Sequence, residues 1–135
     1  MQERLIEWRE EFRIGLPEVD EEHRSMIAAL NRLHRELVVG VSAVRVARAL
    51  GAIHSEISAH FALEERDMSA MGYAEYGLHK GDHERLLDEI LDILDEVVAS
   101  GCYDPATLSS RLSAWFAEHF RSFDARLHRW LAGRG

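Results

Sequence analysis

Apolar residues recur every three or four positions through most of the chain, and this spacing is typical of helices that bury one face. The pattern divides into stretches of about 19–39, 42–71, 74–100 and 104–131, which are separated by short connections. No stretch shows the strict alternation of a half-buried strand bounded by turn residues. Because long helices with short connections lie antiparallel, the pattern predicts an all-α fold, an up-down-up-down four-helix bundle.

The expected helix ends carry residues suited to those positions. Ser42 can cap the second helix, Asp104 can cap the fourth, and Gly101 follows the third. Residues 1–18 are partly apolar but show no long helical stripe, and we interpret them as an arm that packs across the bundle. A chain of 135 residues has the length of one compact domain, so we expect a single domain over 1–135.

Composition narrows the classes of partner and compartment. The formal net charge of -8 argues against nucleic-acid binding, which needs clustered Lys and Arg. Cys102 is the only cysteine, so no disulfide can form within the chain. No stretch is apolar enough for a membrane span or a secretion signal, and we expect a cytoplasmic protein. Eight histidines are the one unusual feature.

Histidines or carboxylates interrupt the apolar stripe of every predicted helix. The inward-facing set is His23, His60, Glu64, His79, His83, His119 and Asp124. Helical residues four apart differ by about 40° in direction. His60 with Glu64, and His79 with His83, therefore each aim two ligand atoms at one point. Each pair alone is weak evidence, but four helices supply ligands at the same height. Burying so many ionisable groups is costly unless a cation compensates, and a metal site is therefore expected.

The step from His119 to Asp124 does not fit a regular helix. Residues five apart in an ideal α-helix point about 140° away from each other. The apolar stripe also changes phase by one residue between these two positions. We therefore predict a single-turn π-bulge there, a distortion that often occurs at functional sites.

The ordered motifs resemble those of the bacterial hemerythrins over nearly the whole chain. They are Gly15-Leu-Pro-Glu-Val-Asp-Glu-Glu-His23, His60-Phe-Ala-Leu-Glu64-Glu65, His79-Lys-Gly-Asp-His83 and Trp115-Phe-Ala-Glu-His119-Phe-Arg-Ser-Phe-Asp124. The resemblance implies two iron ions joined by an oxo or hydroxo bridge. It assigns one iron to His79, His83 and His119, the other to His23 and His60, and both bridging carboxylates to Glu64 and Asp124.

Counting ligands on this assignment makes the two irons unequal. The oxygen bridge and two carboxylates give each iron three ligands, so three histidines complete six while His23 and His60 leave one position open. In the family dioxygen binds at that position. The resemblance therefore implies a non-haem di-iron protein that binds dioxygen reversibly, for carriage, storage or delivery, and that is not primarily an enzyme.

Other functions stay open at this point. The same ligands would serve a sensor of dioxygen, redox state or iron, a di-iron oxidase or peroxidase, or a nitric-oxide-reactive enzyme. A zinc site is a further alternative, because histidines four apart bind zinc well. A ferritin-like carboxylate site is a poor fit, since no Glu lies three residues before any histidine.

Several residues near the predicted ligands have assignable roles. Four carboxylates lie near the ligands in sequence and are candidate hydrogen-bond partners of the imidazoles: Glu65, Asp20, Asp82 and Glu118. We interpret each of them as a surface or cap residue in preference to a partner, and Glu65, next to a bridging carboxylate, is the best candidate for a partner. The three remaining histidines, His34, His54 and His128, are expected at surface or boundary positions, and Cys102 in a loop. Apolar residues one turn from the ligands form either a water-excluding wall or plain core: Ile27, Leu30, Leu86, Leu87, Trp115, Phe116 and Phe120.

Overall fold

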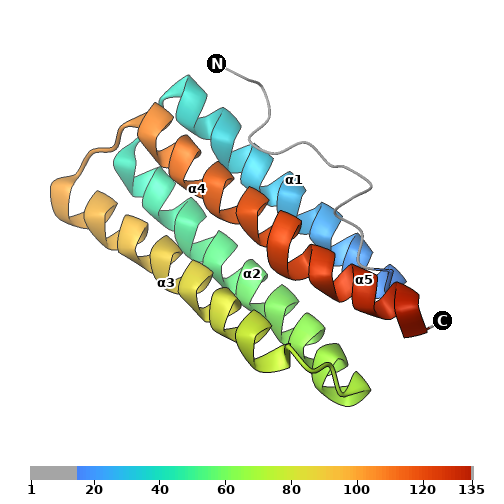
Figure 1. Ribbon diagram of the computed structural model, residues 1–135. Helices are drawn as coiled ribbons and strands as arrows, with labels where there is room; N and C mark the ends of the chain where they lie inside the picture. The colour runs from blue at the N-terminus through green and yellow to red at the C-terminus, as the bar shows by residue number, and fades with distance from the viewer. Residues whose placement is uncertain (1–14, 135) are drawn as a thin grey trace.

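The computed structural model describes residues 15–134, and within them every regular element is helical. The elements are α1 (Pro17–Val39), α2 (Ala43–Met71), α3 (Tyr76–Ser100), α4 (Pro105–His119), the π-helical turn η2 (Phe120–Asp124) and α5 (Ala125–Arg134). The last three follow one another without a break and form a single fourth rod (Figure 1). Most of the predicted arm, residues 1–14, lies outside the described residues.

The four rods form an antiparallel bundle, as the sequence predicts. Helix α2 packs against α1 and α3, and α4 packs against α3 and α1, so consecutive rods are neighbours around the bundle (Figure 1). None of the described helices has the length and apolar character needed to cross a membrane.

Local capping explains where the helices begin and end. The hydroxyl of Ser42 accepts a hydrogen bond from the Arg45 N–H at 3.2 Å, and the Asp104 carboxylate accepts one from the Thr107 N–H at 3.1 Å, so both predicted caps are confirmed. Helix α1 begins two residues earlier than expected, at Pro17, because proline has the φ of a first helical residue and lacks only an N–H that would be unpaired there.

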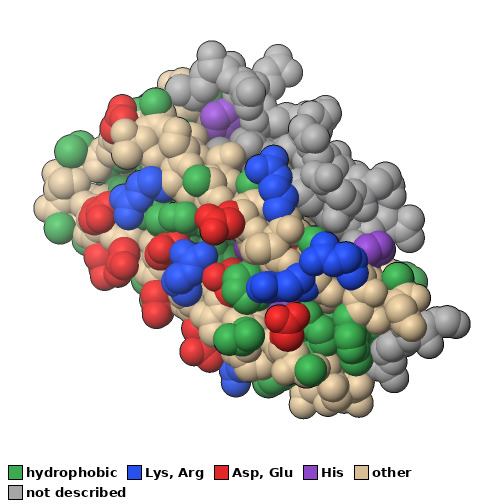
Figure 2. Space-filling model, in the orientation of Figure 1, with side chains coloured by type: hydrophobic (Ala, Val, Ile, Leu, Met, Phe, Trp, Pro, Cys, Tyr) green, Lys and Arg blue, Asp and Glu red, His purple; other side chains and the backbone are tan. Residues whose placement is uncertain are grey.

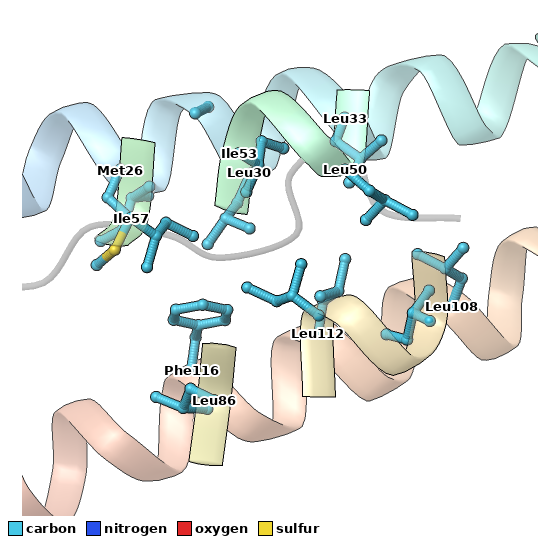
Figure 3. Close-up of a cluster of buried hydrophobic side chains, with 14 of the residues drawn as sticks. Met26, Leu30, Leu33, Leu50, Ile53, Ile57, Leu86, Leu108, Leu112 and Phe116 are labelled. Carbon is cyan, nitrogen blue, oxygen red and sulfur yellow. The ribbon is translucent and has the colours of Figure 1, made fainter. Parts of the chain in front are cut away.

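Two apolar clusters fill the interior. The larger one takes side chains from α1, α2, α3 and α4, and Figure 3 shows those of Leu30, Ile57, Leu112 and Phe116 directed toward one another. The smaller one, near the start of α1, consists of Val19, Met68, Tyr73 and Leu127, with Leu16 packed against it. On the fourth rod, His119 and Asp124 lie between Phe116 of the larger cluster and Leu127 of the smaller one. The polar residues thus occupy a layer between two apolar ones.

The surface charge is unevenly distributed. Acidic side chains line the edge of the molecule that α3 forms (Figure 2), where Asp88, Asp92, Asp95 and Glu96 are exposed. Arg85 is the only arginine within α3.

Candidate metal centre

The seven predicted ligand residues come together in the interior. Each has a relative exposure of 2% or less: His23, His60, Glu64, His79, His83, His119 and Asp124. Their possible ligand atoms form two overlapping groups, and within each group all the ligand atoms lie within 4.8 Å of one another. One group consists of Glu64, His79, His83, His119 and Asp124, and the other of His23, His60 and Glu64. This is the same division into three and two histidines that the resemblance implied.

The carboxylate of Glu64 turns one oxygen toward each group. Its Oε1 lies 2.7 Å from Nε2 of His79 and 3.4 Å from Nε2 of His83. Its Oε2 lies 3.0 Å from Nε2 of His23 and 3.7 Å from Nε2 of His60. A carboxylate divided in this way has the geometry needed to bridge two cations.

Asp124 is divided in the same sense. Its Oδ1 lies 2.9 Å from Nε2 of His79 and 3.0 Å from Nε2 of His119. Its Oδ2 lies 3.5 Å from Nε2 of His23, in the other group. Both carboxylates therefore face both groups of histidines.

Although the nitrogens and oxygens of the cluster lie close together, many of them have no hydrogen-bond partner. Within the described part of the chain, buried atoms without a hydrogen-bond partner include both ring nitrogens of His60 and His79, Nε2 of His83 and His119, Oε1 of Glu64 and both oxygens of Asp124. Buried polar atoms normally have partners, because leaving one unpaired costs about 1–3 kcal/mol. A set of unpaired imidazole nitrogens and carboxylate oxygens aimed at common points fits metal cations, which would take these atoms as ligands.

The electrostatics of the cluster suit a bound cation. Burial lowers the pKa of His60 to about 3, so this imidazole is neutral and ready to act as a ligand. Burial also acts to lower the pKa of His119, but the charge of Asp124 and the hydrogen bond with Asp82 outweigh it and raise the pKa to about 10. Burial favours the protonated form of Glu64, yet the surrounding imidazoles hold its pKa well below its usual range. Protons on imidazoles thus compensate the two carboxylates.

The π-bulge predicted between His119 and Asp124 is confirmed. Residues Phe120–Asp124 form one π-helical turn inside an otherwise α-helical rod. The wider turn absorbs the extra residue, so that Nε2 of His119 and Oδ1 of Asp124 lie 3.0 Å apart. Leu127 remains buried beyond the turn, because the change of phase in the apolar stripe is absorbed at the same point.

Two carboxylates hold the outer nitrogens of ligand imidazoles. Oε2 of Glu65 lies 2.9 Å from Nδ1 of His83, so the best of the candidates named from the sequence is a partner. Oδ2 of Asp82 lies 2.6 Å from Nδ1 of His119. The expectation that Asp82 occupies a surface or cap position was wrong, because this side chain is buried. A signal was present in the spacing, since Asp82 lies three residues after His79 and close to the same helix face.

The other assignments near the centre have mixed outcomes. Asp20 is buried, contrary to the surface or cap position expected for it, and its carboxylate accepts a hydrogen bond from the Gly15 N–H at 3.2 Å. Glu118 is exposed, as expected. His34 was misplaced: it is buried, and its Nδ1 is hydrogen-bonded to Oγ of Ser109 at 2.9 Å. The remaining polar positions are as expected, with His54 half-buried and His128 and Cys102 exposed.

Aromatic rings enclose the imidazoles. Phe61 stacks on His83 with ring centroids 3.8 Å apart and planes within 5°. Phe123 stacks on His119 at 5.9 Å, and Phe120 lies 5.4 Å from His23. Of the apolar positions named from the sequence, Ile27, Leu30, Leu86, Phe116 and Phe120 are buried, and Leu87 and Trp115 are partly buried. Sequence reasoning missed Phe61 and Phe123.

An antiparallel four-helix bundle with histidines and carboxylates converging in its interior defines an all-α protein with a candidate metal centre. The family model described as hemerythrin HHE cation binding domain matches residues 15–131. The chain is 31% identical over 124 residues to a bacteriohemerythrin of Stenotrophomonas maltophilia (strain R551-3), covering 89% of this chain and 77% of that protein. The chain belongs to the hemerythrin family.

Further comparisons agree with this family. A bacteriohemerythrin of Methylococcus capsulatus (strain ATCC 33009 / NCIMB 11132 / Bath) is 24% identical over 121 residues, which cover 89% of this chain and 92% of that protein. A crystal structure of wild-type hemerythrin superposes with a TM-score of 0.81 at 24% identity, covering 93% of this chain and 96% of the other. The structural likeness supports the four-helix bundle fold.

Proposed function

We propose that the chain holds two iron ions joined by an oxo or hydroxo bridge. His79, His83 and His119 would bind one iron, His23 and His60 the other, and Glu64 and Asp124 would bridge them. The observation that carries the proposal is the division of both carboxylates, each of which turns one oxygen toward each group of histidines. An imidazole-rich donor set with carboxylates suits iron, and membership of the hemerythrin family favours iron over zinc.

We further propose that the protein binds dioxygen reversibly at an open position on the iron of His23 and His60. Support comes from the unequal histidine count, which leaves that iron with one ligand fewer. The surroundings also favour a neutral diatomic ligand, because Phe120 lies beside His23 and the buried side chains of Met26 and Ile27 follow on α1. An apolar wall excludes water and slows irreversible oxidation. On this proposal the protein carries, stores or delivers dioxygen and is not primarily an enzyme.

Anaerobic loading with ferrous iron tests the metal assignment. We expect two iron ions for each chain and, after oxidation, the absorption of an oxo-bridged diferric centre. His60→Ala should lose the second iron, whereas the matched variant His54→Ala, six residues earlier on α2 and outside the cluster, should keep both. A colourless protein that prefers zinc would contradict the assignment.

Stopped-flow mixing of the diferrous protein with dioxygen tests the ligand. A stable adduct that releases dioxygen when the solution is deoxygenated is expected for a carrier or store. Immediate conversion to the diferric form would contradict reversible binding and favour a sensor, an oxidase or a peroxidase. Mixing the diferrous protein with nitric oxide in the same instrument tests the remaining alternative, a nitric-oxide-reactive enzyme.

A further inference from the structure

A chain of charged side chains on α3 links His119 to the surface. Oδ2 of Asp82 lies 2.6 Å from Nδ1 of His119, and the side chains are 7% and 0% exposed respectively. On the other oxygen, Oδ1 accepts hydrogen bonds from Nε of Arg85 at 3.0 Å and lies 2.9 Å from its Nη2. Nη1 of Arg85 in turn donates to Glu89 at 3.0 Å. The buried carboxylate therefore lies between an imidazole and a guanidinium.

This arrangement exceeds what local helix stability requires. Solvent-accessible ion pairs three or four residues apart on a helix contribute little to its stability, and one such pair, Arg85 with Glu89, is present here. Asp82 differs because it is buried and its contact crosses from α3 to the fourth rod. Its hydrogen bond with Nδ1 fixes the imidazole plane and leaves Nε2 directed at Asp124 and the centre.

We propose that Asp82 is a positioning residue that sets the reduction potential of the metal bound by His79, His83 and His119, and that Arg85 opposes it. This inference rests on the proposed function. An anionic partner on Nδ1 makes an imidazole a more basic ligand, and a more basic ligand favours the higher oxidation state of the metal. The guanidinium of Arg85 withdraws part of that charge from the carboxylate, because it holds the opposite oxygen with two nitrogens.

Substitutions of Asp82 and of Arg85 should shift the reduction potential in opposite directions. Asp82→Asn keeps a side chain of similar size but removes the negative charge, so the reduced state should be favoured. Arg85→Gln leaves the carboxylate uncompensated, so the oxidised state should be favoured. Arg85 has a side chain that is 45% exposed, and its replacement should leave the fold intact.

The experiment is a redox titration of the iron-loaded full chain, followed by its absorption spectrum. We expect Asp82→Asn to shift the equilibrium toward the reduced form about tenfold, which is about 59 mV for one electron. Arg85→Gln should shift the equilibrium the other way by a smaller factor. The matched control is Glu84→Gln, which removes a charge next to His83 from an exposed side chain and should shift nothing.

Separate readouts distinguish failure of this inference from failure of the proposed function. Iron content and helical circular dichroism are measured on every variant before titration. If wild type binds no iron, the proposed function is overturned. If variants with two irons and wild-type helicity show no shift, or if Asp82→Asn and Arg85→Gln shift in the same direction, the role of Asp82 and Arg85 is overturned. Should Asp82→Asn fail to fold, Arg85→Gln decides the question alone.

Discussion

The ring of Phe61 lies flat against the imidazole of His83, with centroids 3.8 Å apart and planes within 5° of parallel. Phe61 is 1% exposed and belongs to the larger apolar cluster, so one side chain joins the hydrophobic core to the metal centre. Glu65, one turn further along α2, holds Nδ1 of the same imidazole. The orientation of His83 is therefore fixed both by stacking and by a hydrogen bond.

Replacing Phe61 should weaken both the fold and the centre. Phe61→Ala removes a fully buried ring and leaves a cavity, so we expect the free energy of unfolding to fall by about 3–5 kcal/mol. Urea denaturation of the metal-free protein measures this loss, and the iron content of the loaded protein measures the loosening of His83. The control is Leu78→Ala, because Leu78 is 64% exposed and its truncation should change stability by less than about 0.5 kcal/mol.

The buried pair of His34 and Ser109 should matter for stability and not for metal binding. The two side chains join α1 to α4 through a 2.9 Å hydrogen bond between Nδ1 and Oγ. Ser109→Ala removes this partner from a buried imidazole, and we expect a loss of about 1–3 kcal/mol in the free energy of unfolding.

The neighbouring serine supplies a matched control for that prediction. Ser110 is exposed on the same helix, and Ser110→Ala should leave stability unchanged or slightly higher, because alanine has the better helix propensity. Thermal unfolding of both variants, with iron content measured in parallel, makes the comparison. Loss of iron from Ser109→Ala would show that this pair is coupled to the centre, contrary to the prediction.

The fold and the first layer of the centre follow from spacing along the chain. Each predicted ligand occupies a position where the apolar stripe requires an inward-facing residue, so helix geometry alone directs it into the core. Even the irregular turn was predictable, because the stripe loses one residue of phase between His119 and Asp124. A periodic pattern carries this information within a single helix, and no contact between helices has to be known.

The hydrogen-bond partners of the buried histidines could not be predicted with the same success, because these contacts join different helices. Asp82 is 37 residues from His119, and Ser109 is 75 residues from His34. Asp82 lies at the edge of the buried face, where a carboxylate turns either outward to solvent or inward to a neighbour. Only the position of the fourth rod decides between these, and it depends on packing across the whole bundle.

Changing the length of the π-helical turn should show that iron binding requires the histidine and the aspartate to lie on the same face of the fourth rod. Deleting Arg121, which is exposed, would place the histidine and the aspartate four residues apart and let a regular α-helix keep both on one face. We expect this variant to fold. Inserting one alanine after Arg121 should instead turn the aspartate and Leu127 by about 100° and abolish iron binding. Circular dichroism and iron content distinguish the two, and an insertion variant with full iron content would contradict the prediction.

Metal uptake should release protons from the centre. In the metal-free protein the pKa of His119 is raised to about 10, so this imidazole is a cation at pH 7, whereas His60 has a pKa of about 3 and is neutral. Because an imidazole must be neutral to bind a metal, binding through His119 displaces the proton on its Nε2. A raised pKa means that protons compete with the metal at every pH below about 10, and the competition grows as the pH falls.

Two measurements check this proton linkage. Anaerobic titration calorimetry with Fe²⁺ at pH 7, in buffers of different ionisation enthalpy, should show heat that depends on the buffer, since the buffer takes up the released protons. The apparent affinity should weaken by about tenfold for each pH unit lowered and each proton displaced. His54→Ala should behave as wild type, because that imidazole lies outside the cluster. Heats that are identical in all buffers would mean that the imidazoles are already neutral, and that the carboxylates are compensated in another way.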